Sequence, residues 1–261
     1  MENPVKLEQT EGIAIITLNR PSAYNSFDAE MVQLLAETLV KVALDPAVVG
    51  VVISGEGKAF CAGGNLAWVK GYGENLGAAF HELAARFHQG ILEIRHMPKP
   101  VVAAINGFSA GGGFSLALAC DFRIMETSAT LKQGYTTNGL SIDGGGTYAL
   151  PRLVGLARAL EIAAFDEPIS SEKAYAWGLA TEVVDDGESV KRAIQMLEEM
   201  KTKSLTSFAA SKKLITDSFN TTFEAQLEKE RELLSWCGNQ PNGREGIAAF
   251  LEKRKPVFNR P

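Results

Sequence analysis

The chain has 261 residues, 46% of them hydrophobic and 22% charged, and a formal net charge of −5; this is the composition of a globular protein with a sizeable core. The negative balance argues weakly against a nucleic-acid partner but leaves room for a local basic patch. No apolar run approaches the roughly 18 residues that would span a membrane, and the N-terminus lacks the basic-then-apolar order of a signal peptide. We therefore expect a cytoplasmic protein without a membrane partner.

The first half of the chain alternates patterns typical of strands and of helices. Strands are predicted over residues 12–21, 48–55, 100–107 and 122–133, and helices over 28–45, 87–98 and 114–121. Strand signals nearly vanish after Leu150. The remaining predictions are a short capped helix within 170–184 that ends at Gly178, and amphipathic helices over 188–204, 206–218, 222–238 and 242–258. This order favours an α/β core over residues 1–195, followed by a helical C-terminal region over residues 196–261.

The three cysteines, Cys61, Cys120 and Cys237, lie far apart and lack CxxC spacing. They indicate neither a zinc site nor a disulfide framework. We expect each to act as a small buried hydrophobic side chain.

A glycine-rich segment follows the strand predicted at 100–107. Gly107 to Gly111 match G-x-S-x-G around Ser109, the pattern of a nucleophile elbow. A serine hydrolase of that fold supplies its histidine after the serine, whereas all three histidines precede Ser109, and Gly113 stands where a P-loop needs lysine. Two interpretations stay open: a tight turn, or bare backbone N–H groups that bind an oxyanion.

Two further segments carry candidate chemistry. Gly63 and Gly64 follow the strand at 48–55 and could supply a second set of N–H groups beside the first. In "GLSIDGGGTYALPR", residues 139–152, Asp143 precedes three glycines. Asp143 is either a helix N-cap or a proton carrier. The glycines make a poor helix start, and Pro151 is expected to interrupt any long helix.

Taken together, "AFCAGGNL", "PVVAAINGFSAGGGFSLALACD", "GLSIDGGGTYALPRLVG", "AYAWGLATEVV" and "REGIAAFLEKRKPVF" resemble the crotonase superfamily of enoyl-CoA hydratases and isomerases. The resemblance covers essentially the full chain. It implies a crotonase-like ββα spiral core with a helical C-terminal trimerisation region, assembled as a homotrimer or a dimer of trimers. It also implies an acyl-CoA thioester substrate and no metal or redox cofactor, because CoA is part of the substrate.

The resemblance assigns roles to residues of the quoted motifs. The backbone N–H groups of Gly64 and Gly112 would form an oxyanion hole for the thioester oxygen. The expected CoA-binding residues are Ala23, Tyr24, Ala62, Gly64, Asn65 and Leu66, with Lys253 meeting CoA phosphates from this or a neighbouring subunit.

The sequence departs from the hydratase pattern at two positions. Typical hydratases carry two glutamates, and Ser115 and Tyr135 occupy those places here, where they would line the pocket without acting as carboxylates. Asp143 stands where 1,2-epoxyphenylacetyl-CoA isomerases carry an aspartate, and where 4-chlorobenzoyl-CoA dehalogenase carries its nucleophile. His88 stands at the place of the dehalogenase's water-activating histidine, or is a partly buried helix histidine. His81 and His96 are expected at the surface.

Three functions follow as hypotheses. The leading one is an isomerase that shifts a double bond or rearranges a ring-bearing CoA ester, with Asp143 carrying the proton between carbons on one face. The second is a hydratase, or a dehalogenase-like hydrolase, that uses Asp143 and His88. The third is a non-catalytic scaffold that binds acyl-CoA or RNA.

Overall fold

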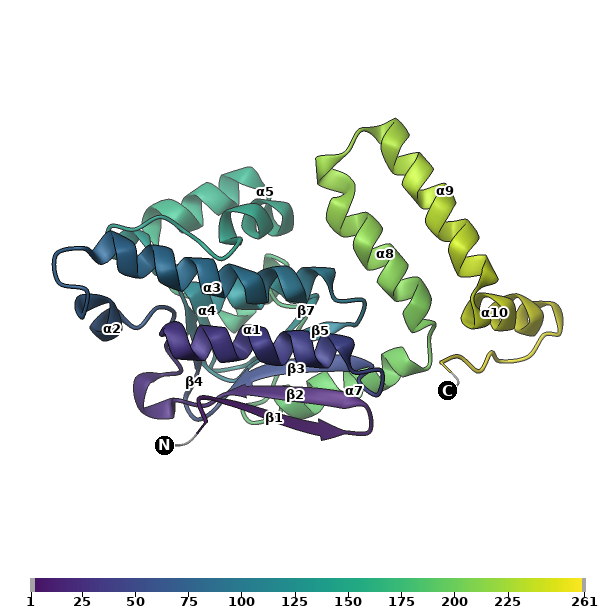
Figure 1. Ribbon diagram of the computed structural model, residues 1–261, viewed down its shortest axis with the longest axis horizontal. Helices are drawn as coiled ribbons and strands as arrows, with labels where there is room; N and C mark the ends of the chain where they lie inside the picture. Colours follow the sequence, from purple (N-terminus) through teal and green to yellow (C-terminus); the bar gives the residue numbers. More distant parts are fainter. Residues whose placement is uncertain (1–2, 260–261) are drawn as a thin grey trace.

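A computed structural model describes residues 3–259 as two sheets surrounded by helices (Figure 1). The larger sheet has the order β1-β2-β3-β5-β7-β10, with β1 (Val5–Thr10), β2 (Ile13–Leu18), β3 (Gly50–Gly55), β5 (Val101–Ile105), β7 (Phe122–Glu126) and β10 (Glu182–Val184). The smaller sheet has the order β4-β6-β8-β9, with β4 (Ala59–Cys61), β6 (Phe108–Ala110), β8 (Thr130–Lys132) and β9 (Ile169–Ser170). Apart from the antiparallel pairs β1–β2 and β8–β9, neighbouring strands run parallel.

Helices cover both faces of the larger sheet. The helices of the described residues are α1 (Ala29–Leu44), α2 (Leu66–Lys70), α3 (Leu76–His96), α4 (Gly112–Ala119), α5 (Gly146–Phe165), α6 (Ser171–Ala176), α7 (Ser189–Lys201), α8 (Leu205–Asp217), α9 (Phe223–Asn239) and α10 (Pro241–Leu251). Short 3-10 turns are η1 (Pro21–Ala23), η2 (Thr136–Asn138) and η3 (Ser218–Asn220). β3 and β5 are buried along their whole length because helices pack on both of their faces.

The chain repeats a strand–strand–helix unit. β3, β5 and β7 enter the larger sheet, and the strands that follow them, β4, β6 and β8, pair in parallel in the smaller one. This confirms the predicted ββα architecture. Because β4 and β6 are neighbours, the glycine-rich segments that follow them are brought side by side.

The structure corrects three expectations about the elements. β9 and β10 do form after Leu150, but they have two and three residues, too short to show a periodic pattern. α3 begins at Leu76, well before the predicted start at residue 87. α5 begins at the glycines and continues through Pro151; its backbone break lies at Gly155, which has a φ of 77°. A single proline removes one intrahelical hydrogen bond, and here the helix continues past it.

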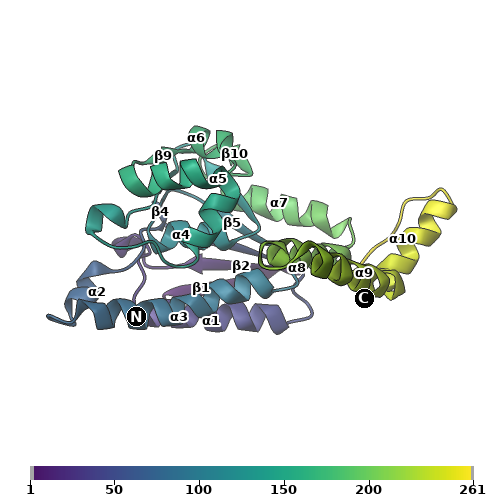
Figure 2. The same ribbon diagram turned by 90° about the horizontal axis from the view of Figure 1, so that it is seen from above.

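The C-terminal helices extend away from the sheets at the end of the molecule opposite α2 (Figures 1 and 2). α7 still belongs to the sheet cover, since Ala193 and Leu197 pack against it, so the boundary predicted after residue 195 falls inside this helix. α8 is anchored by Lys212, whose Nζ donates to Asp121 Oδ2 at 2.8 Å and to Ile94 O at 2.9 Å. Within residues 3–259, no helix has both the length and the apolar character needed to span a membrane.

Candidate active site

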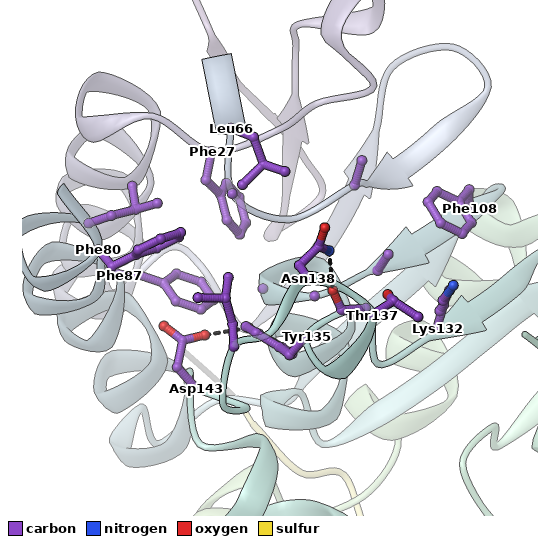
Figure 3. A pocket seen from close by; sticks show the side chains of 18 residues that line it. Phe27, Leu66, Phe80, Phe87, Phe108, Lys132, Tyr135, Thr137, Asn138 and Asp143 are labelled. Atoms are coloured by element: carbon purple, nitrogen blue, oxygen red, sulfur yellow. Dashed lines mark hydrogen bonds between the residues drawn. The ribbon is translucent and has the colours of Figure 1, made fainter. Parts of the chain in front are cut away.

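A cavity of about 270 Å³ lies between the two glycine-rich segments, α3 and the segment from Lys132 to Asp143 (Figure 3). One side, here called the glycine wall, consists of Ala62, Gly64, Ala110, Gly111 and Gly112. The side chains that face it from α3 and from residues 132–143 form the side-chain wall. Among the described residues that line this cavity, Asp143 is the single carboxylate.

The glycine wall is built by close backbone contact. A Cβ on Gly63, which has a φ of 87°, would lie 2.8 Å from Ala110 O and 3.1 Å from Gly112 N. A Cβ on Gly113 would lie 2.1 Å from Cys61 O, so only glycine fits there. Within residues 3–259 no protein acceptor takes the N–H of Gly64 or of Gly112. Two such free donors beside one cavity suit an oxygen that gains negative charge.

Asp143 is fixed through both its side chain and its main chain. Its Oδ1 accepts a hydrogen bond from the Tyr135 hydroxyl (Figure 3). Ser115 Oγ donates to the Asp143 carbonyl oxygen at 2.7 Å. The N-cap interpretation is wrong: the N-cap of α5 is Gly145, which has a φ of 78°, and no side chain caps this helix. The carboxylate is therefore free to face the cavity.

The Tyr135 hydroxyl remains neutral at ordinary pH. Burial raises its pKa well above the usual value, and the charge and hydrogen bond of Asp143 raise it further. The loop that carries Tyr135 is held by Asp166, whose Oδ1 accepts from Gly134 N at 2.6 Å and whose Oδ2 accepts from Thr137 N at 2.9 Å. Tyr135 thus presents a fixed donor to Asp143.

His88 lies beside Asp143 but faces a second cavity. Its Nε2 is 3.7 Å from Asp143 Oδ2 and accepts a hydrogen bond from Gly144 N at 3.2 Å. This contact occupies the Nε2 lone pair. The side chain is 47% exposed, more than expected for a partly buried helix histidine. The second cavity, of about 390 Å³, has His88, Gly144 and Tyr148 in its wall.

Only some of the expected CoA-binding residues line the cavity. Ala62, Gly64 and Leu66 line the cavity. Asn65 instead caps α2, where its Oδ1 accepts from Ala67 N and Trp68 N. Ala23 and exposed Tyr24 lie outside the lining but next to it, because Ala62 N donates to Tyr24 O at 3.0 Å.

Lys253 and Ser115, which were expected at the CoA phosphates and in the substrate pocket, do not line the cavity. Lys253 follows α10, at the end of the molecule opposite α2, and this chain does not bring it to the cavity. Ser115, only 2% exposed, lies behind the side-chain wall and touches the main chain of Asp143.

The other sequence candidates behave as structural residues. Ser109 is fully buried in β6, so it is no exposed nucleophile. Cys61 and Cys120 are buried as expected, and burial raises the pKa of each thiol to about 12; Cys237 is only partly buried. His81 and His96 are exposed, as predicted. In the part of the chain that the structure describes, no three His, Cys, Asp or Glu side chains are grouped to hold a metal ion.

Sequence reasoning missed much of the apolar lining and one cation. The missed residues are Phe27, Phe80, Leu83, Phe87, Phe108, Lys132, Thr137, Asn138 and Leu140. Phe80, Leu83 and Phe87 follow the i, i+3, i+7 spacing of one helix face, a signal that could have extended the predicted helix toward the N-terminus.

The chain is similar to known proteins along nearly its whole length. Residues 8–261 match the family model described as enoyl-CoA hydratase/isomerase. The chain is 36% identical to "1,2-epoxyphenylacetyl-CoA isomerase" of Escherichia coli K12, covering 95% of both chains, and 37% identical to a "Probable enoyl-CoA hydratase" of Rhodobacter capsulatus, covering 97% of both. A solved structure of an enoyl-CoA hydratase from Polaromonas sp. JS666 superposes with a TM-score of 0.92 at 36% identity, covering 98% of this chain and 99% of that one. With its two glycine loops meeting at one cavity, the chain belongs to the enoyl-CoA hydratase/isomerase family.

Proposed function

We propose that this protein isomerises an acyl-CoA thioester, with Asp143 as the base that removes a proton from one carbon and returns it to another. The observation that carries the proposal is the placement of Asp143, the single carboxylate among the described lining residues of a cavity that also exposes the N–H groups of Gly64 and Gly112. The family and the isomerase among its similar proteins support it.

The proposed reaction places negative charge on the thioester oxygen beside the glycine wall and a proton on Asp143 of the side-chain wall. Removing a proton from a carbon conjugated to the thioester carbonyl leaves an enolate, whose negative charge lies mainly on the oxygen. The N–H groups of Gly64 and Gly112 bind that oxygen, and each such donor lowers the barrier by about 3–4 kcal/mol. The proton now on Asp143 returns to a different carbon of the same enolate. No atom is gained or lost, so one carboxylate completes the cycle.

Tyr135 and Ser115 position this base. The Tyr135 hydroxyl donates to Oδ1 and leaves Oδ2 free, while Ser115 holds the carbonyl of the same residue at 2.7 Å. The turn that follows reverses at Gly144 and Gly145, with φ values of 59° and 78°. Two contacts from different elements therefore restrict where the carboxylate can lie, as proton transfer to a fixed carbon requires.

Hydration is the second candidate because His88 Nε2 lies 3.7 Å from Asp143 Oδ2. Water held between these atoms could add to an enoyl-CoA, and the same pair could hydrolyse an acyl or aryl intermediate. Against this, the Nε2 lone pair is already occupied by Gly144 N–H, and a hydratase needs a second group to protonate carbon.

Purified protein should be tested with a 3-enoyl-CoA and a trans-2-enoyl-CoA, following double-bond migration and water addition separately. Migration that disappears in Asp143→Asn supports the proposal. Rapid hydration that survives Asp143→Asn would contradict the proposal and favour a hydratase in which His88, without Asp143, activates the water. Acyl-CoA binding without turnover of any ester, in wild type and variant alike, would favour a non-catalytic acyl-CoA scaffold, while RNA binding in the same preparation would favour the RNA-binding one.

We also infer that the chain associates into a homotrimer or a dimer of trimers in the cytoplasm. α9 has no buried residue within the described chain. Phe223, Leu234 and Trp236 on it are 72%, 76% and 49% exposed, which is unusual for a helix without a partner. Sedimentation equilibrium that returns only the monomer mass would contradict the assembly.

A further inference from the structure

Lys132 is the one cation among the described lining residues of the cavity, and its side chain is unpaired. Within residues 3–259 its ammonium takes part in no hydrogen bond or ion pair. Lys132 contributes a little to the lowered pKa of Asp166, which results chiefly from hydrogen bonds from Thr137 and Gly134 that outweigh the effect of burial. Asp166 is thus satisfied without Lys132.

Strand pairing directs Lys132 toward the cavity. Lys132 ends β8 and lies opposite Ala110 of β6, while Leu131 lies opposite Ser109. Leu131 and Ser109 are fully buried, so the alternate positions Phe108, Ala110 and Lys132 share the other face. All three of these line the cavity. Phe108, 37% exposed, places an apolar ring beside the ammonium.

The two ends of the cavity differ in chemistry. Asp143, Phe80 and Phe87 lie at one end, and Phe108 and Lys132 lie at the other (Figure 3). The glycine wall reaches both ends: Gly111 N donates to Lys132 O at 3.2 Å, and a Cβ on Gly112 would lie 3.6 Å from Phe87 Cε1. A thioester with its oxygen on the glycine wall and its acyl carbons beside Asp143 directs its sulfur, and everything attached to the sulfur, toward Lys132.

We propose that the end of the cavity formed by Lys132 and Phe108 receives the CoA part of the substrate, with the Lys132 ammonium binding its phosphate groups. This inference rests on the proposed function for the direction of the thioester. The pantetheine arm is neutral, and the phosphates supply the anionic oxygens that an ammonium pairs with. This role differs from that expected for Lys253, which the chain leaves far from the cavity.

The test compares ligands with and without phosphate in wild type and Lys132→Met, which keeps the length of the side chain and removes its charge. CoA binding, measured by titration calorimetry, should weaken about tenfold, while binding of a phosphate-free pantetheine thioester should stay unchanged. With acyl-CoA, KM should rise by a similar factor and kcat should change by less than about twofold. Added salt should weaken CoA binding less in the variant than in wild type.

Lys41→Met is the matched control, since Lys41 is exposed on α1, away from the cavity lining, and its removal changes the net charge equally. It should leave CoA affinity unchanged, and Lys132→Arg should restore most of it. Unchanged CoA affinity in Lys132→Met overturns the inference. So does an equal loss for CoA and the pantetheine thioester, or a loss confined to thioesters whose acyl group carries a carboxylate. Failure of the wild type to bind CoA at all would instead overturn the proposed function.

Discussion

The glycine wall and the side-chain wall of the cavity present different kinds of atoms to a ligand. The glycine wall offers main-chain N–H groups, and the backbone behind it is packed so closely that a Cβ on Gly113 would lie 2.1 Å from Cys61 O. The side-chain wall offers Asp143, Tyr135 and Lys132, each carried on a loop or strand end. Activation of a thioester needs only the first wall, whereas the choice of reaction depends on the second.

The difference explains why family membership leaves the reaction open. A binding site for a thioester oxygen serves isomerisation, hydration and hydrolysis equally, because each passes through negative charge on that oxygen. The position and number of proton-carrying groups separate these reactions. Substitutions on the two walls should therefore fail in different ways.

The largest effect is expected for Asp143→Asn. Asparagine keeps the shape of the side chain but cannot accept a proton from carbon, so the isomerisation rate should fall about 10³-fold. The rate is measured by following double-bond migration in a 3-enoyl-CoA. The affinity for CoA is the control and should not change. An Asp143→Asn enzyme with more than about a tenth of wild-type kcat would contradict the role of this residue as the base.

On the glycine wall, Gly112→Ala should lower kcat about 10²-fold, because the new Cβ would lie 3.2 Å from Phe27 Cδ2 and displace the N–H donor. Gly113→Ala is the contrasting variant. Its Cβ would meet backbone atoms of Cys61, which cannot move aside as a ring can, so this variant should lose folding stability instead. Thermal unfolding together with kcat separates the two. A Gly112→Ala protein with wild-type kcat would show that this N–H is not used.

Tyr135→Phe should reduce kcat about tenfold with little change in KM, because it removes the hydrogen bond to an ionised partner while keeping the ring. The raised pKa of Tyr135 also predicts that this hydroxyl stays protonated and causes no loss of activity up to about pH 10. Equal increases in KM and in the dissociation constant of CoA would indicate that Tyr135 contacts the ligand and does not position Asp143.

His88→Gln should change the isomerisation rate by less than about threefold, since glutamine can still accept from Gly144 N–H. Any hydration or hydrolysis of a CoA ester should fall far more if His88 activates water. Measuring both activities in one preparation gives the ratio directly. A large loss of isomerisation would require His88 to take part in proton transfer.

The smallest predicted effect is a change in the free energy of unfolding caused by two buried cysteines. Burial raises the pKa of Cys61 and Cys120 to about 12, whereas an unfolded thiol ionises near pH 8.5. The unfolded chain therefore loses these protons first, and the free energy of unfolding should decrease as pH rises from about 8.5 to 10. Urea denaturation should show a smaller decrease in Cys120→Ala. Equal slopes in both proteins would mean that this thiol ionises in the folded state too.

The sequence predicted the features that follow from local pattern. Glycines directly after buried strands indicated the two glycine-rich loops, within which the family resemblance singled out Gly64 and Gly112. The acid before a glycine run identified Asp143 as a candidate. Contacts between distant segments were not predictable in this way. The role of Ser115 depends on how α4 packs against the turn at residues 143–146, and the direction of Lys132 depends on the pairing of β8 with β6.

The first half of one helix, α3, was not predicted for a different reason. The first half of α3 follows Gly71 and Gly73 and contains Gly77, residues that mask a helical pattern. Phe80, Leu83 and Phe87 were therefore missed, although they form much of the apolar end of the cavity. The helix α5 continues through Pro151 and breaks at Gly155, whose φ of 77° a glycine adopts without a Cβ clash.

The packing around Ser115 bears on how this site could be changed by evolution or engineering. A Cβ on Gly144 would lie 2.9 Å from Ser115 Cβ, and one on Gly146 would lie 2.8 Å from Ser115 Oγ, so Ser115 packs directly against the backbone of the turn that follows Asp143. A single Ser115→Glu substitution would have to push the Asp143 turn out of place before it added a second carboxylate. The one-carboxylate site is thus coupled to the packing of this turn, and we expect a two-carboxylate version to need changes in the turn as well as at position 115.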